Sequence, residues 1–266
     1  SKTIGFIGAG AMGEALLKGM IEADLFLPQN VFISDINQQR LSELKAEYGV
    51  HTTAGNLELV AEVDYIVLAV KPKIIGQVMQ KIGSKLTVEQ KLFSIAAGVT
   101  TTQIEDYLSV EVPVVRLMPN TPALIGEGAI AYTLGTAAGM EVGALVEKLF
   151  NPVGQVVETE EKLMDAVTGL SGSGPAYIYV LIEALSDAGV YEGLDRTTAT
   201  DLAVQTVIGA AKMVQKMDAH PGQLKDMVTS PGGTTITGLK ILEESGLRSA
   251  LYQAVEAAAE KSRQLG

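Results

Sequence analysis

The residues that most constrain the fold of this chain are three glycines that follow a short apolar run near its start. Gly8, Gly10 and Gly13 form a G-x-G-x-x-G pattern between a predicted strand at 3–7 and a predicted helix at 11–22. The first glycine makes a tight turn, the second lets a pyrophosphate approach the backbone, and the third lets helix and strand pack closely. The phosphates would lie at the helix N-terminus, where free N–H groups favour anions. The pattern therefore predicts a dinucleotide site formed by Ile7, Gly8, Ala9, Gly10, Ala11, Met12 and Gly13.

An acidic residue stands where such a site would meet the adenosine ribose. Asp35 lies 22 residues after Gly13, close to the offset of about 20 residues that is typical of dinucleotide-binding units. A carboxylate at this position favours NAD because it repels a 2′-phosphate. Ser34 can instead donate to a 2′-phosphate, whereas Arg40, the nearest guanidinium, lies a turn into the following predicted helix. The sequence leaves both NADH and NADPH open.

Short β-branched runs alternate with amphipathic stretches over residues 1–160. The predicted strands are 3–7, 30–34, 65–69, 91–96, 112–117, 129–132 and 155–157, and the predicted helices are 11–22, 38–48, 74–83, 101–108 and 136–150. This alternation is typical of βαβ units with a parallel sheet that is covered on both faces. We expect an α/β fold in which residues 1–160 form a Rossmann-type, doubly wound and mainly parallel sheet.

Ligands in such sheets bind beyond the carboxyl ends of the strands. The segments that follow three of the predicted strands are therefore expected to line the cofactor. They contribute Ala69, Val70, Lys71 and Pro72, then Ala97 and Gly98, and then Asn120 in a loop with two prolines. The alternatives are a solvated loop lysine for Lys71 and a purely structural turn around Asn120.

Residues 161–266 carry no strand pattern and predict a second, all-helical domain. One helix begins at residues 173–175 and is expected to end before Gly189, and a second covers 196–217. Others begin at Pro221, after Gly233 and at 247. The helix at 196–217 is apolar on nearly every face, which is typical of a buried helix. A domain of this size cannot easily bury such a helix alone, so we expect it to lie in a subunit interface.

Two stretches of the helical half combine glycines with hydroxyl groups before a predicted helix, at 169–177 and at 230–235. Each can present N–H and O–H donors to an anion. The alternative is ordinary helix capping, since Ser and Thr favour that position. Two such stretches beside a dinucleotide domain favour a substrate that carries a carboxylate.

The composition excludes several classes of function. The formal net charge of −11 argues against nucleic acid and against an anionic membrane as partners. The absence of cysteine excludes disulfides and thiolate chemistry, and two histidines are too few for a multi-histidine metal site. The apolar runs are far shorter than the ~20 residues of a membrane span. With no secretory signal pattern at its start, the chain is expected in the cytoplasm.

Several motifs together resemble the pyrroline-5-carboxylate reductase family over the whole chain. They are FIGAG at 6–10, AVKP at 69–72, AAGV at 96–99, MPNTP at 118–122, DAVTGLSGSGPAY at 165–177, HPGQLKD at 220–226 and SPGGTT at 230–235. The resemblance implies reduction of 1-pyrroline-5-carboxylate to L-proline by NADPH or NADH. It also implies a helical domain that interlocks with its twin in a homodimer, often assembled further into a decamer.

The resemblance further implies roles for individual residues. The substrate carboxylate and ring nitrogen would be bound by Ser230, Pro231, Gly232, Gly233, Thr234 and Thr235. Thr235 would be the catalytic hydroxyl beside the imine, and Asn56 would join Ser34 and Asp35 at the adenosine end. Met227 departs from the pattern, because some members carry an asparagine there near the cofactor. Hydride transfer to a protonated imine yields a neutral amine and needs no strong acid, so the absence of cysteine and the presence of only two histidines fit this chemistry.

Other functions are compatible with parts of this pattern. A β-hydroxyacid dehydrogenase shares the layout but needs a catalytic lysine soon after its glycine-rich interdomain segment, and no lysine follows Gly174 before Lys212. Reduction of another imine is a further alternative. A non-catalytic NAD(P)-sensing regulator would have a degraded substrate loop, whereas residues 230–235 retain the glycines and hydroxyl groups of that loop.

Overall fold

The computed structural model describes residues 2–264, which form two compact units. Within the described range, the first unit contains residues 2–173 and 256–264, and the second contains residues 174–255.

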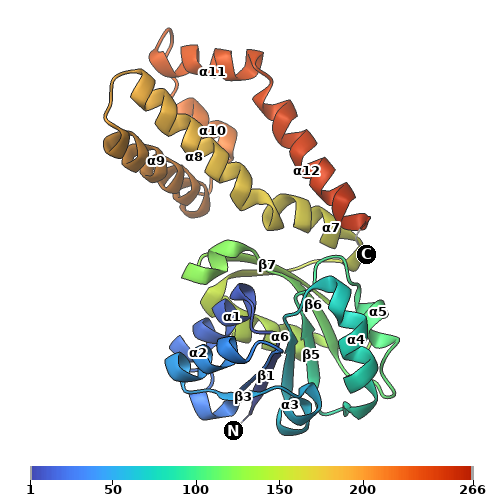
Figure 1. The fold of residues 1–266 in the computed structure, drawn as a ribbon. Coiled ribbons are helices and arrows are strands. Elements are labelled where there is room, and N and C mark those ends of the chain that lie inside the picture. The colour runs from blue at the N-terminus through green and yellow to red at the C-terminus, as the bar shows by residue number, and fades with distance from the viewer. Residues whose placement is uncertain (1, 265–266) are drawn as a thin grey trace. The chain divides into compact units, whose positions relative to one another are not determined.

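The first unit is built on one eight-stranded sheet (Figure 1). Its strands are β1 Ile4–Ile7, β2 Val31–Ser34, β3 His51–Thr53, β4 Tyr65–Leu68, β5 Lys91–Ser94, β6 Val114–Met118, β7 Gly128–Leu134 and β8 Gly154–Glu158. Their order is β3-β2-β1-β4-β5-β6-β7-β8. The pairs from β3 to β6 are parallel, whereas β7 is antiparallel to β6 and parallel to β8. The prediction of a doubly wound, mainly parallel sheet is confirmed.

Helices cover both faces of this sheet (Figure 1). They are α1 Ala11–Glu22, α2 Gln38–Tyr48, α3 Asn56–Glu62, α4 Pro72–Ile82, α5 Thr101–Glu105 and α6 Met140–Phe150. A further short helix, α7 Met164–Val167, follows the last strand. Short 3-10 turns lie at Pro28–Asn30, Gly83–Lys85, Thr121–Ile125, Asn151–Val153 and Glu161–Leu163. Leu16, Leu44 and Phe150 of α1, α2 and α6 pack in one buried cluster. Leu59, Met79 and Ile104 of α3, α4 and α5 pack in the other. Two separate cores therefore hold the sheet between helical layers, which is why β1 and β4 are apolar on both faces.

The chain reverses its direction across the sheet at β1 and β4, which are neighbours. From β1 the chain passes through α1 to β2 on one side, and from β4 it passes through α4 to β5 on the other. The carboxyl ends of β1 and β4 therefore flank the crevice where open α/β sheets bind ligands. This topology brings the glycine-rich turn after β1 next to the segment that begins at Ala69.

The sequence predicts no element between residues 48 and 65, and this prediction is wrong, because β3 and α3 lie there. The strand β3 has only three residues and pairs with β2 at the sheet edge. His51 is exposed and the two threonines that follow are half-buried, so no apolar alternation marks the strand. The rings of His51 and Phe32 stack with centroids 4.8 Å apart. Tertiary pairing forms this strand, and α3 then begins at Asn56.

The second unit is entirely helical over its described residues. It contains α8 Gly174–Tyr191, α9 Arg196–Lys216, α10 Pro221–Met227, α11 Thr234–Glu244 and the first part of α12 Leu247–Arg263. The prediction that the first of these helices ends before Gly189 is wrong, because α8 continues to Tyr191. A Cβ on Gly189 would lie 3.1 Å from Cβ of Ala199. The glycine lets α8 and α9 approach closely rather than ending the helix.

Large apolar side chains of the second unit are exposed on the single chain. On α9 the buried residues are only Ala199 and Ala203 among those described, although its composition is that of a buried helix. The exposed side chains on α8 and α9 include Ile178, Val180, Leu185, Leu202, Ile208, Met213 and Val214. Large apolar side chains left exposed in this number on two neighbouring helices favour packing against another molecule.

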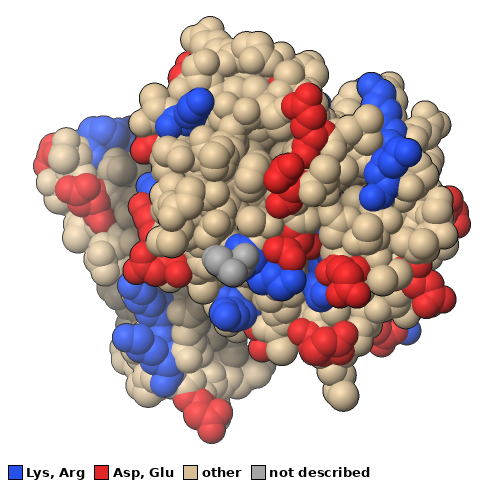
Figure 2. Space-filling view, turned by 90° about the horizontal axis from the view of Figure 1, so that it is seen from below, with Lys and Arg blue, Asp and Glu red and all other residues tan. Residues whose placement is uncertain are grey.

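Three structural features concern the binding of nucleic acid, membranes and metal ions. Figure 2 shows basic and acidic side chains interspersed on one face of the molecule, with uncharged residues between them. Within residues 2–264, no helix combines the length and apolar character needed to cross a bilayer. Over the same residues, no group of three or more His, Asp or Glu side chains is arranged to hold a metal ion.

Candidate functional site

The turn between β1 and α1 has a different structural reason for each of its three glycines. Gly8 has a φ of +108°, and a Cβ there would lie 2.5 Å from the Ala69 carbonyl oxygen. A Cβ on Gly13 would lie 3.0 Å from the Gly8 carbonyl oxygen and 3.1 Å from Cβ of Ala69. A Cβ on Gly10 would meet nothing within 4 Å, and no side chain caps α1 at this residue. The N-terminus of α1 is thus left open beside a bare backbone, which fits a pyrophosphate.

Three residues predicted for the adenosine end meet beside this turn. The fully buried Ser34 donates its hydroxyl hydrogen to Oδ1 of Asn56 over 2.8 Å. The Asp35 carboxylate accepts the Ala9 N–H at Oδ2 (2.7 Å) and the Asn37 N–H at Oδ1 (2.8 Å). The structure therefore brings Ser34, Asp35 and Asn56 to the edge of the glycine turn. Asn56 reaches it because it is the first residue of the unpredicted helix α3.

Arg40 also reaches the glycine turn, although the sequence suggests only that it lies a turn into the next helix. Its Nε donates to the Ala9 carbonyl oxygen over 3.2 Å. Its Nη2 is paired with Glu14 of α1, and its Nη1 lies 3.3 Å from Glu43 of α2. Glu14 in turn accepts the Tyr48 hydroxyl over 3.3 Å. Sequence spacing could not reveal this cluster, because the packing of α1 beside α2 creates it.

The segment after β4 leads directly into a helix. Ala69 donates its N–H to the Ile7 carbonyl over 2.8 Å, and its own carbonyl faces Gly8. Lys71 is the N-cap of α4, and Pro72 occupies the first helical position, where its missing N–H costs nothing. A cavity of about 580 Å³ is lined by Lys71, Pro72, Val99 and Tyr107, among others. This segment lies where a ligand of the glycine turn would extend across the sheet.

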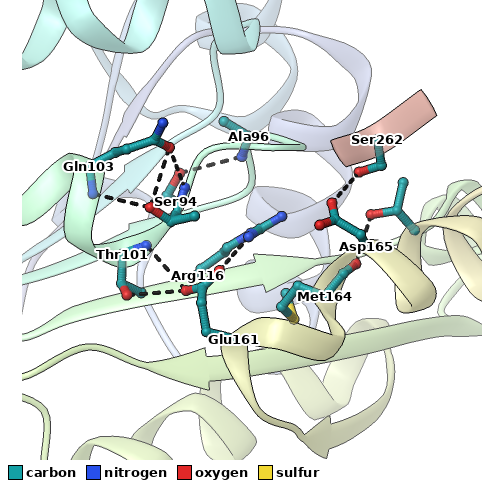
Figure 3. A network of polar contacts seen from close by, with 11 residues as sticks. Ser94, Ala96, Thr101, Gln103, Arg116, Glu161, Met164, Asp165 and Ser262 are labelled. Atoms are coloured by element: carbon teal, nitrogen blue, oxygen red, sulfur yellow. Dashed lines mark hydrogen bonds and ion pairs between the residues drawn. The ribbon is translucent and has the colours of Figure 1, made fainter. Parts of the chain in front are cut away.

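A partly buried polar network lies beside the turn after β5 (Figure 3). Gly98 has a φ of +77°, and Thr100 then caps α5 through a capping box with Gln103. The Arg116 side chain on β6, only 3% exposed, is ion-paired with Glu161. Glu161 also accepts the N–H and the hydroxyl of Thr101, over 3.2 and 3.1 Å. One carboxylate thus joins β6, the first residue of α5 and the segment that leaves the sheet.

Asn120 is held by backbone groups on both sides of its amide. Nδ2 donates to the Ser171 carbonyl over 3.0 Å, and Oδ1 accepts the Ala129 N–H over 2.9 Å. The side chain is 8% exposed. These contacts fix the loop after β6 against β7 and against residue 171. They agree with the alternative interpretation of Asn120, in which the residue belongs to a structural turn.

The stretch at 169–177 is not the open loop that the sequence predicts. Residues Thr168–Gly172 form a π-helical turn between α7 and α8. The hydroxyls of Thr168 and Ser171 bond back to the carbonyls of Met164 and Val167. A Cβ on Gly172 would lie 2.6 Å from Cε of Met118. Local side-chain hydrogen bonds and a close contact at glycine keep this stretch helical, and such wider turns are frequent at functional sites.

The stretch at 230–235 does form an open helix start, in the second unit. Gly232 has a φ of +68°, and Gly233 caps α11 without a side-chain hydrogen bond. Gly233 donates its N–H to the Ser230 carbonyl over 3.1 Å, which folds the turn back on itself. Ser230 is exposed and Thr235 is half-buried. The N-terminus of this 11-residue helix therefore lies beside two hydroxyl-bearing residues, an arrangement that favours an anion.

A Rossmann-type sheet with an open glycine turn, followed by a helical unit, is the architecture of a dinucleotide-binding protein. The family model described as "Pyrroline-5-carboxylate reductase dimerisation" matches residues 161–265. The model described as "NADP oxidoreductase coenzyme F420-dependent" matches residues 3–98.

Full-length relatives identify the family. A pyrroline-5-carboxylate reductase of Methanosarcina acetivorans is 47% identical over 266 residues, covering 100% of this chain and 98% of the relative. Human pyrroline-5-carboxylate reductase 2 is 44% identical over 268 residues, covering 99% and 83%. The Plasmodium falciparum pyrroline carboxylate reductase with NADP bound has a TM-score of 0.90 at 38% identity, covering 100% and 98%. The chain belongs to the pyrroline-5-carboxylate reductase family.

Proposed function

We propose that this chain reduces 1-pyrroline-5-carboxylate to L-proline with NADPH or NADH as hydride donor, the last step of proline biosynthesis. The observation that carries the proposal is the match of the whole chain to this family. Two open helix N-termini, one suited to the cofactor and one to the substrate, support it. The N-terminus of α1 suits a pyrophosphate, and that of α11 suits a carboxylate. The bound nicotinamide would supply a hydride, two electrons and one proton, to the imine carbon. The ring nitrogen, already protonated, keeps its proton and becomes the amine.

The residues of the helical half would bind and orient the substrate. We propose that the carboxylate and ring nitrogen are held by Ser230, Pro231, Gly232, Gly233, Thr234 and Thr235, with Asn120 as a further contact. Thr235 would place its hydroxyl beside the imine nitrogen and so fix the carbon that accepts the hydride. Because the product nitrogen is neutral, this hydroxyl has to orient the ring rather than donate a proton. The amide of Asn120 would act mainly through the loop that it fixes, since backbone groups already engage its oxygen and its nitrogen.

The cofactor would be held along the carboxyl edge of the sheet. The pyrophosphate suits residues 7–13, and the adenosine suits Ser34, Asp35 and Asn56. The nicotinamide half would follow the segments after β4 and β5, which contribute Ala69, Val70, Lys71, Pro72, Ala97 and Gly98. The open space over Gly10 and the uncapped start of α1 support this placement.

We further propose that residues 1–160 act as the cofactor domain and residues 161–266 as the dimerisation and substrate domain. The exposed apolar side chains of α8 and α9 support a homodimer through this half. Assembly of dimers into a decamer and a cytoplasmic location belong to the same proposal. Light scattering of the purified protein should give at least a dimeric mass, and a stable folded monomer would contradict the interface.

The reaction is tested by following oxidation of reduced nicotinamide after pyrroline-5-carboxylate is added. Thr235→Ala should lower kcat by about 10- to 100-fold, the range for loss of one orienting hydrogen bond, with little change in the cofactor Kd. Thr237→Ala is the matched control on the same helix, because its hydroxyl is bonded to the Gly233 carbonyl (3.0 Å). No oxidation with either cofactor by the intact oligomer would refute the reaction, and equal loss in both variants would refute the role of Thr235.

A further inference from the structure

We infer that this chain selects NADH over NADPH, because Asp35 is a fixed anion at the adenosine ribose and Arg40 is neutralised by Glu14 and Glu43. The inference rests on the proposed function, since it specifies which cofactor form the same site accepts. It follows from contacts around Ala9, whose N–H bonds to Asp35 and whose carbonyl bonds to Arg40.

The Asp35 carboxylate cannot readily turn away from a ligand. Each of its oxygens accepts one backbone N–H, from Ala9 at 2.7 Å and from Asn37 at 2.8 Å. Hydrogen bonds from backbone to a carboxylate are charge-assisted and strong. A carboxylate oxygen has two lone pairs, so each oxygen retains one for a ribose hydroxyl. The carboxylate is therefore positioned to accept from a 2′-hydroxyl and to repel a 2′-phosphate, which carries a charge of about −1.5 to −2.

Ser34 does not compensate for this repulsion. A serine hydroxyl has a single hydrogen to donate, and that hydrogen is directed to Oδ1 of Asn56. The side chain is also fully buried. The sequence offered Ser34 as a donor to a 2′-phosphate, whereas the structure uses the hydroxyl to connect β2 to α3.

Arg40 is the basic residue closest in sequence to Asp35, and two carboxylates already engage it. Nη2 is paired with Glu14 and Nη1 with Glu43, while Nε donates to the Ala9 carbonyl. Tyr48 bonds the other oxygen of Glu14, which restrains that carboxylate. Together Asp35, Glu14 and Glu43 outweigh Arg40 by two negative charges. A guanidinium in this setting is a poor partner for a phosphate unless one carboxylate is removed.

The residue after Asp35 fits the same conclusion. Ile36 is 97% exposed. Burial of its apolar side chain by a ligand would lower the free energy of the complex. It offers a flat, uncharged adenine an apolar contact, and it supplies no positive charge for a neighbouring phosphate. We expect NADH to bind at least about tenfold more tightly than NADPH, because juxtaposed like charges weaken an interface by this much or more.

The test is a titration of the full-length oligomer with NADH and with NADPH, without substrate, followed by nicotinamide fluorescence. Asp35→Asn keeps the side-chain shape but removes the charge, and it should shift the Kd ratio towards NADPH by about tenfold or more. Glu14→Gln should lower the Kd of NADPH more than that of NADH, because it releases Arg40 from one carboxylate. Glu22→Gln is the matched control on α1, since its partner Lys18 lies at 3.8 Å on the helix surface.

Tighter NADH binding in the native protein and the two ratio shifts would support the inference. NADPH binding as tight as NADH binding in the native protein would overturn it, as would an unchanged ratio in both variants. If Asp35→Asn weakens both cofactors equally by disturbing the glycine turn, Glu14→Gln alone decides the outcome. Because no substrate is present, failure to reduce pyrroline-5-carboxylate would refute the proposed function without altering these ratios.

Discussion

Removal of the Glu161 carboxylate should destabilise the sheet unit strongly, because it leaves a buried guanidinium without a counter-charge. The Arg116 side chain is 3% exposed, and its Nη2 has no hydrogen-bond partner among the described residues. Breaking a fully buried pair costs about 3–5 kcal/mol. Glu161 is 31% exposed, so solvent screens part of the ion pair. We therefore expect loss of the charge to lower the free energy of unfolding by about 2–3 kcal/mol. Loss of the two hydrogen bonds to Thr101 adds about 1 kcal/mol.

For Glu161→Ala the total is about 3–4 kcal/mol, which should lower the midpoint of thermal unfolding by about 6–16 °C at ~2–4 °C per kcal/mol. The unfolding midpoint of Glu161→Gln should lie between those of Glu161→Ala and the native protein, because the amide oxygen still accepts from Thr101 but carries no charge. The assay is thermal unfolding followed by circular dichroism, at one protein concentration because the oligomer dissociates by mass action.

The neighbouring glutamate provides the control. Glu160 is paired with Lys162, and these side chains are 67% and 73% exposed, so Glu160→Ala should change stability by at most about 1 kcal/mol. If Glu161→Ala unfolds at the same midpoint as Glu160→Ala, the reasoning about the buried pair is wrong. The same carboxylate holds Thr101 at the start of α5 (Figure 3), so a small effect would also show that this contact contributes little to stability.

Two further predictions concern the glycine turn and acid stability. Gly8→Ala should destabilise the protein by about 1–3 kcal/mol because of its φ of +108°, whereas Gly10→Ala should leave the unfolding midpoint unchanged and abolish cofactor binding; equal stability losses would contradict these roles. Partial burial favours a higher pKa for Asp64, but hydrogen bonds from Lys2 and Thr3 outweigh it and lower the pKa below the ordinary value of 3.8. The carboxylate thus contributes stability above about pH 4 that is lost as the pH falls through its lowered pKa. Asp64→Asn should therefore flatten the acid side of a stability–pH curve, and an unchanged slope would refute this.

Much of the fold follows from local patterns in the chain. The strands β1 and β4 are visible as short continuous apolar runs, which are typical of buried parallel strands. The amphipathic stretch at α2 is visible because its apolar side chains repeat every three to four residues. The elements β3 and α3 are three and seven residues long, too short for either period to stand out. Gly189 shows a second limit, since a glycine within a helix resembles a helix end unless the neighbouring helix is known.

In the candidate site, too, some features follow from local sequence and others from tertiary packing. The sequence by itself predicted which residues would carry the chemistry, because the need for bare backbone at Gly8, Gly10 and Gly13 and for donors at residues 230–235 is local. Only the tertiary structure decided what the side chains around them do. Glu14, Asp35 and Arg40 meet at Ala9 because α1, β2 and α2 pack together, and Glu161 reaches Arg116 across 45 residues of chain. Charge pairing depends on distance in space, and separation along the chain does not set that distance until the core forms.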